Sequence, residues 1–212
     1  MTDSYLVCMD SETGGLKAKQ ADILTLFMAV TDEDFKVIDE LDLKLKPNDR
    51  LPIADPGALA VNKIDLQKHL ADPNTVTYAE AKTKIVAFAK KYLKKRGRYS
   101  NLIVLGQNVM FDLKFIWEYI IPEEEWEGLF SYNVEDTKTA SLFLKRCGWL
   151  PKDIGTLKSL VEYFNIPRRE AHEAKGDVHM TIDVYREMIN LMKSKKENGG
   201  ASQDIISLLE AE

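Results

Sequence analysis

One stretch near the amino terminus constrains the fold more than any other, because an apolar run leads directly into two acids and two glycines. Residues 5–9 are followed by Asp10, Glu12 and the pair Gly14-Gly15, the pattern of a buried strand that ends at a site. Strand side chains alternate between faces, so Asp10 and Glu12 should point the same way, where two carboxylates repel each other without a cation. The stretch therefore predicts a divalent-metal site. It also fits a turn capped by Asp10 with Glu12 in solvent.

Further apolar segments predict a mixed sheet. Residues 23–30 form a nearly continuous apolar run, as in a strand covered on both faces. Residues 41–46 alternate apolar with charged side chains, which favours an antiparallel edge strand with one wet face. With the first strand they predict an antiparallel three-strand meander, and residues 102–106 and 132–136 add further strands.

Helices are predicted between and after these strands. A capping box at Thr77 and Glu80 begins the first long one, which ends in the basic run 90–98. That run fits either a solvated helix end or a nucleic-acid-binding patch. Further helices are expected over 137–146 and 156–164 and from Asp177 onward, so the fold class is α/β, with helices flanking the sheet.

The size and charge of the chain limit its class. Its 212 residues suit one α/β domain over 1–195 with a linker and short apolar segment over 196–212. The first residues lack the basic region of a signal peptide and no apolar run is long enough to cross a membrane, so we expect a cytoplasmic protein. Cys8 and Cys147 have no metal-ligand spacing. A net charge of −5 argues against broad nucleic-acid binding but allows a local, metal-containing site.

Two later places also put an acid at the start of a helix. Asp112 falls in the first turn after the strand 102–106, and Asp177 in the first turn of the last helix. His172 precedes Asp177 by five residues on a loop. Each alone fits an ordinary helix N-terminal acid or an exposed histidine.

Taken together, these acids resemble the three motifs of the DnaQ-like 3′→5′ exonucleases of the DEDDh branch, in order, spacing and residue type. The motifs are Asp10-x-Glu12-Thr13, Asn108-x-x-x-Asp112 with Phe111, and His172-x-Ala174-x-x-Asp177. The resemblance spans residues 5 to 195, and Asp136-Thr137 and Leu157-x-x-Leu160 support it. It implies a ribonuclease H-like fold. The chain departs from the usual family pattern in two places. It has Gly14-Gly15 where members usually have Thr or Ser followed by Gly, and it has Gln107 where many members have a histidine.

The resemblance also implies a chemistry, hydrolysis of a phosphodiester with two Mg²⁺ or Mn²⁺ ions. The implied metal ligands are Asp10, Glu12, Asp112 and Asp177. Carboxylates suit such hard ions. His172 would be the general base that takes a proton from the attacking water, and the expected product is a nucleoside 5′-monophosphate released from the 3′ end.

Five residues are expected to bind the terminal nucleotide. Backbone groups of Thr13 and Gly14 would meet the terminal sugar, and Leu16 and Phe111 would pack on the last base. For Leu16 and Phe111, burial in the core is the alternative. Asn108 would orient the substrate or a water.

The leading hypothesis is a metal-dependent exonuclease on single-stranded DNA ends, in proofreading or end trimming. An exoribonuclease of the oligoribonuclease or tRNA-trimming kind is the alternative, and a non-catalytic polymerase adaptor is a third. At the end of the chain, residues 203–209 resemble the short peptides that bind a sliding clamp, but they also fit an amphipathic helix that folds back on the domain.

Overall fold

The computed structural model describes residues 5–96, 99–168 and 174–198. Its strands are β1 (Tyr5–Thr13), β2 (Ile23–Thr31), β3 (Val37–Lys46), β4 (Thr75–Thr77), β5 (Lys95–Arg96), β6 (Tyr99–Ser100), β7 (Leu102–Gly106) and β8 (Val134–Asp136). Its helices are α1 (Pro56–Asn62), α2 (Leu66–Ala71), α3 (Tyr78–Tyr92), α4 (Met110–Tyr119), α5 (Glu123–Trp126), α6 (Thr137–Arg146), α7 (Leu157–Tyr163) and α8 (Ala174–Asn198).

The main sheet has the order β4-β3-β2-β1-β7-β8. Strands β1, β2 and β3 are antiparallel neighbours, whereas β4, β7 and β8 each pair in parallel. This arrangement confirms the predicted α/β class and the three-strand meander. Strand β1 lies inside the sheet between β2 and β7, so its carboxyl end opens onto the centre of one sheet edge.

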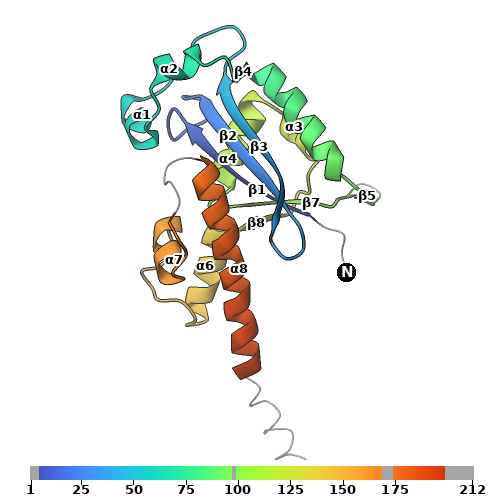
Figure 1. The fold of residues 1–212 in the computed structure, drawn as a ribbon, viewed down its shortest axis with the longest axis vertical. Coiled ribbons are helices and arrows are strands. Elements are labelled where there is room, and N and C mark those ends of the chain that lie inside the picture. Colours follow the sequence, from blue (N-terminus) through green and yellow to red (C-terminus); the bar gives the residue numbers. More distant parts are fainter. Residues whose placement is uncertain (1–4, 97–98, 169–173, 199–212) are drawn as a thin grey trace, which may run out of the picture.

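The alternation of side chains divides the core between the two faces of the sheet. Val7 and Met9 pack in the larger cluster, which includes residues of α3 and α4. Cys8 between them packs in a second cluster with Val178 and Ile182 of α8. Helices α3 and α4 therefore cover one face and the first half of α8 covers the other (Figure 1).

Beyond the sheet, α8 continues alongside α6 and α7 (Figure 1). A third cluster fills this region, including Leu144 of α6, Leu160 of α7 and Val184 of α8. Helix α8 therefore packs on the sheet with its first half and on α6 and α7 with its later turns.

Several boundaries differ from the expectations. Strand β3 is an edge strand only in its first part, because Lys44–Lys46 pair in parallel with the short strand β4. Helix α3 ends at Tyr92, and residues 95–96 of the basic run instead pair with 99–100 as β5 and β6. Helices α2 and α5 were not expected. Both helices are too short for a helical repeat of apolar residues to be recognised in the sequence.

At the carboxyl end, α8 runs to Asn198, so residues 196–198 of the segment expected as a linker are helical. Lysine and glutamate are good helix formers and extend the helix past its last packed turn. The segment 203–209 lies outside the described residues. Among the described helices, none is both long and apolar enough to cross a membrane.

Candidate active site

The structure brings three of the predicted acids together at the carboxyl end of β1. Asp10, Glu12 and Asp177 each offer a carboxylate oxygen, and these oxygens lie within 4.8 Å of one another. The three residues are half-buried. Asp10 and Glu12 come from one strand, whereas Asp177 comes from α8, more than 160 residues later in the chain.

Alternation along β1 explains the meeting. Asp10 and Glu12 follow Cys8 at two-residue steps and so share its face, the face covered by α8. Cys8 also anchors α8 beside the site, because its thiol donates to the carbonyl oxygen of Val178 at 3.6 Å. Val178 is the neighbour of Asp177, so this packing places the third acid opposite the first two.

Asp112 approaches these acids from the opposite face, but it is not one of the three whose oxygens lie within 4.8 Å of one another. It lies in the first turn of α4, where it is 3% exposed. Its Oδ1 accepts hydrogen bonds from the backbone N–H of Ser11 at 3.0 Å and from the Ser11 hydroxyl at 2.6 Å. Ser11 stands between Asp10 and Glu12 and points to the other face, so it links Asp112 to the strand that bears the other two acids.

Burial and mutual repulsion disfavour charge on these acids. Burial, followed by the charges of Asp112, Asp177 and Glu12, holds the pKa of Asp10 well above its usual range. Burial, followed by Asp177 and Asp112, raises the pKa of Glu12 to about 8. Burial also raises the pKa of Asp112, and the hydrogen bonds from Ser11 oppose that rise. Neighbouring carboxylates thus add to the effect of burial on Asp10 and Glu12.

These residues fit a divalent cation. Their donors are all carboxylate oxygens, the ligands that Mg²⁺ and Mn²⁺ prefer. Within the described ranges, no lysine or arginine forms an ion pair with Asp10 or Glu12. A cation at this point would relieve the repulsion that raises their pKa values.

Asp136 fixes the turn that carries Asn108. Its carboxylate accepts from the backbone N–H groups of Asn108 at 3.1 Å and Val109 at 2.9 Å. It also caps α6 by accepting from Lys138 N–H at 2.8 Å. Asn108 has a φ of +66°, a left-handed conformation that asparagine tolerates better than most residues. Asp136, a half-buried acid at the end of β8, thereby positions the start of α4 and hence Asp112.

Gly14 permits a close approach between two loops. A Cβ atom there would lie 2.5 Å from the carbonyl oxygen of Ile53. The Gly14 N–H donates to the carbonyl of Asp22, and its own carbonyl accepts from Asp55 N–H, each at 2.7 Å. The Thr13 carbonyl accepts from the side chain of Asn62 at 2.8 Å. These backbone groups hold the adjoining loop and α1, and the expectation that Thr13 and Gly14 also meet a terminal sugar stays a prediction.

Asp22, which sequence reasoning missed, anchors that adjoining loop. It is fully buried and accepts two hydrogen bonds from Arg50, at 2.6 and 2.8 Å, and one from Ile53 N–H at 2.6 Å. Tyr78 donates its hydroxyl to the same carboxylate at 2.9 Å. Nothing near Asp22 in the sequence signals this role, because its partners lie about thirty or more residues away.

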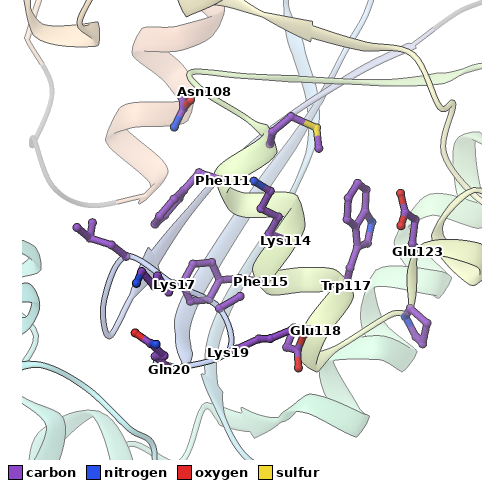
Figure 2. A pocket seen from close by; sticks show the side chains of 14 residues that line it. Lys17, Lys19, Gln20, Asn108, Phe111, Lys114, Phe115, Trp117, Glu118 and Glu123 are labelled. Atoms are coloured by element: carbon purple, nitrogen blue, oxygen red, sulfur yellow. The ribbon is translucent and has the colours of Figure 1, made fainter.

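Two connected hollows lie near the site, and Glu12 lines only one of them. One, of about 880 Å³, is lined by Glu12, Gly14 and residues 53–62 of the neighbouring loop and α1. The other, of about 830 Å³, runs along α4 past Asn108 (Figure 2). Leu16 and Phe111 line both. Leu16 is 87% exposed, which excludes a place in the core, whereas Phe111 is half-buried against the larger core cluster.

His172 lies outside the described residues, so its position relative to the acids stays a prediction. Asn108 is exposed at the rim of the hollow along α4.

Comparison with solved structures shows that this chain shares its fold with exonuclease I. E. coli exonuclease I in complex with a dT13 oligonucleotide superposes with a TM-score of 0.70 at 22% identity, over 92% of this chain and 43% of that one. Exonuclease I of Methylocaldum szegediense gives 0.65 at 24% identity, over 92% and 41%.

A complex of exonuclease I with an SSB C-terminal peptide gives a TM-score of 0.67 at 22% identity, over 92% of this chain and 42% of that one. This chain thus spans less than half the length of the exonuclease I chains that it matches. No family model and no curated protein sequence matches it. The agreement confirms the predicted resemblance at the level of the fold.

Proposed function

We propose that this protein is a metal-dependent 3′→5′ exonuclease that removes nucleoside 5′-monophosphates from single-stranded DNA ends. The observation that carries the proposal is the meeting of Asp10, Glu12 and Asp177 within 4.8 Å, on a fold shared with exonuclease I. Asp112 lies behind this cluster, tied to it through Ser11. In the part of the chain that the structure describes, neither Asp10 nor Glu12 forms an ion pair with a lysine or arginine. A bound cation best explains such a cluster of acids, which is otherwise costly to fold.

In this proposal the carboxylates of Asp10, Glu12, Asp112 and Asp177 hold two Mg²⁺ or Mn²⁺ ions. When bound, such ions lower the pKa of the attacking water and neutralise the charge that develops on the phosphate oxygens. Asp10 would be the central ligand of this set, because its carboxylate lies with those of Glu12 and Asp177 and also feels the charge of Asp112. Ser11 orients Asp112 by donating two hydrogen bonds to its Oδ1, and these bonds partly oppose the rise of its pKa that burial causes. His172 would accept the proton of the attacking water.

The terminal nucleotide would lie in the hollow that contains Glu12. Leu16 projects into solvent at the rim of this hollow and Phe111 forms its wall. Both can therefore pack on the face of the last base and leave its hydrogen-bonding edges untouched. Such stacking tolerates any base. Asn108 would contact the substrate from the rim, and Gly14 lets the two loops of the hollow approach each other.

DNA is proposed over RNA because exonuclease I has been solved with dT13 and with other DNA oligonucleotides. Proofreading and end trimming both fit this activity, and we place the protein in the cytoplasm. An exoribonuclease of the oligoribonuclease or tRNA-trimming kind is the second candidate, because nothing among the four acids distinguishes the sugars. The polymerase-adaptor alternative fits less well, since an adaptor has no use for four converging acids.

The domain division proposed here is an exonuclease domain over residues 1–195 followed by a carboxyl-terminal segment. A sliding clamp that binds residues 203–209 would be a partner in this proposal. A pull-down of the clamp with the wild type and with the double variant Gln203→Ala/Leu208→Ala tests it, and absence of clamp in the wild-type sample would remove this partner.

The exonuclease proposal is tested with matched DNA and RNA oligonucleotides of one sequence, labelled at either end. We expect Mg²⁺ or Mn²⁺ to release labelled mononucleotide from 3′-labelled DNA and to shorten 5′-labelled DNA stepwise, and EDTA to abolish both. Faster loss of RNA would favour the second candidate. Intact strands of both kinds in all metals would refute a nuclease.

A further inference from the structure

The hollow along α4 lies beyond the four acids and has no role in the hydrolysis itself. It begins beside Asn108 and continues past Phe111, Lys114 and Trp117 on the helix (Figure 2). Its opposite wall is the loop that bears Lys17, Lys19 and Gln20. It joins the hollow of the terminal nucleotide, because Leu16, Lys17, Gln20 and Phe111 line both.

We propose that this hollow is a track for the single-stranded DNA immediately 5′ of the terminal nucleotide, with Lys17 and Lys114 contacting its phosphates. The inference rests on the proposed function, which places the 3′ end in the neighbouring hollow. A strand that enters past Glu12 must leave across Leu16 and Phe111, and the hollow along α4 begins there.

Lysines in the track favour binding of the DNA phosphates near the site, and glutamates disfavour it at the far end. Three lysines line the hollow, although the whole chain carries a net charge of −5. Within the described part of the chain, no ion pair joins Lys17, Lys19 or Lys114 to a carboxylate. Their ammonium groups are therefore available to neutralise phosphates.

Two glutamates mark where the track ends. Glu118 and Glu123 line the same hollow, and Glu123 lies beside Trp117, away from Asn108 (Figure 2). From Phe111 to Trp117 the helix rises about 9 Å, at about 1.5 Å for each residue. At about 3.4 Å per nucleotide of stacked strand, this length holds roughly two or three nucleotides.

Aromatic side chains give the track its preference for single strands. The rings of Phe111 and Trp117 lie in the wall at one-helical-turn spacings on either side of Lys114 (Figure 2). Bases must leave a duplex before they can stack on such rings, and stacking on an aromatic face is tolerant of sequence. The alternation of rings and a cation is the arrangement expected for a sequence-independent single-strand site.

The test measures DNA binding in EDTA, so that no cleavage intervenes. The salt dependence of the dissociation constant is determined for a thymidine octamer and a thymidine dinucleotide, with wild type and with Lys17→Gln/Lys114→Gln. Each lost phosphate contact lowers the slope of log affinity against log salt by about 0.7 for a single strand, so the double variant should lower the octamer slope by about 1.4. Lys17 also lines the terminal hollow whereas Lys114 does not, so the dinucleotide slope should fall by at most about 0.7, the share of one contact.

A matched control has the same loss of charge far from the track. Lys193→Gln/Lys195→Gln alters exposed lysines on the end of α8 that projects away from the sheet (Figure 1). The control should bind like wild type. An octamer slope unchanged in Lys17→Gln/Lys114→Gln, or lowered equally by the control, would overturn the track. Digestion of the octamer by wild type in Mg²⁺, measured on the same samples, shows separately whether the proposed exonuclease activity stands.

Discussion

The two faces of the sheet at the end of β1 hold their acids in different ways. On the face covered by α8, Asp10, Glu12 and Asp177 bring carboxylate oxygens within 4.8 Å of one another. On the face covered by α4, Asp112 is 3% exposed and its Oδ1 accepts two hydrogen bonds from Ser11. The protein thus supplies hydrogen-bond donors to the acid on the α4 face.

This difference indicates which side depends on a cation. Burial disfavours charge on Asp10, Glu12 and Asp112. Hydrogen bonds from Ser11 oppose this effect at Asp112, whereas neighbouring carboxylates add to it at Asp10 and Glu12. In our proposal a divalent ion is held mainly by the acids of the α8 face, Asp10, Glu12 and Asp177. Asp112 is positioned before any ion binds, and its orientation should survive removal of the metal.

Loss of an acid on the α8 face should have the largest effect. Asp10→Asn keeps the shape of the side chain but removes the charge on which all three neighbouring acids act. Losing several kcal/mol of transition-state stabilisation corresponds to a fall in turnover on the order of 10⁴-fold. Calorimetric titration with Mn²⁺ should show weaker binding at the same time. An unchanged titration would refute Asp10 as a ligand.

His172→Ala should separate proton transfer from metal binding. Losing a general base lowers turnover by about 10²- to 10⁴-fold, whereas Mn²⁺ binding and thermal stability should stay close to those of the wild type. Single-turnover kinetics on a 3′-labelled strand measure the first effect and calorimetry the second. Near-wild-type turnover would remove His172 from the mechanism.

Ser11→Ala examines the α4 face alone. It removes the hydroxyl that donates to Asp112 at 2.6 Å but leaves the backbone donor in place. Removing a residue that hydrogen-bonds to a metal ligand typically lowers metal affinity or activity by about 10- to 100-fold, so the activity of Ser11→Ala should fall within that range. The matched variant Ser11→Thr retains a hydroxyl and should recover most of the activity. Equal loss in both variants would contradict the positioning role.

Without divalent ions, the stability of the protein should fall as pH rises from about 5 to 8. Glu12 has a pKa of about 8 in the folded protein against an ordinary value of 4.5, so the folded state holds a proton that the unfolded state has lost. Thermal melts in EDTA should lose roughly 2–4 °C for each 1 kcal/mol of this effect, and Mn²⁺ should reverse the loss. Glu12→Gln is the control, and it should flatten the profile. A flat wild-type profile would show that Glu12 titrates normally.

The local part of the site could be predicted from sequence. Alternation along β1 places Asp10 and Glu12 on one face, and this depends only on the two-residue period of a strand. The helix starts at Asp112 and Asp177 were predictable from the strand-and-helix pattern. The long-range contacts were not. The hydrogen bonds of Ser11 to Asp112 join residues 101 positions apart, and no local pattern encodes them.

The surroundings of the terminal hollow were also beyond sequence reasoning. The loop before α1 follows a course set by Asp22, whose partners Arg50 and Tyr78 lie 28 and 56 positions away. The same loop occupies the backbone groups of Gly14 that were expected to meet a sugar. A glycine pair in the sequence indicates a close approach but cannot show whether substrate or protein makes it.

The central claim is that the α8 face of the sheet end holds a divalent cation. The most direct measurement is an anomalous difference map from crystals of this protein soaked in Mn²⁺. We predict a peak coordinated by carboxylate oxygens of Asp10, Glu12 and Asp177, at distances of about 2.0–2.3 Å typical of oxygen ligands. Asp112 should keep its hydrogen bonds to Ser11 on the opposite face. A map at full Mn²⁺ saturation without a peak among these three acids would contradict the account.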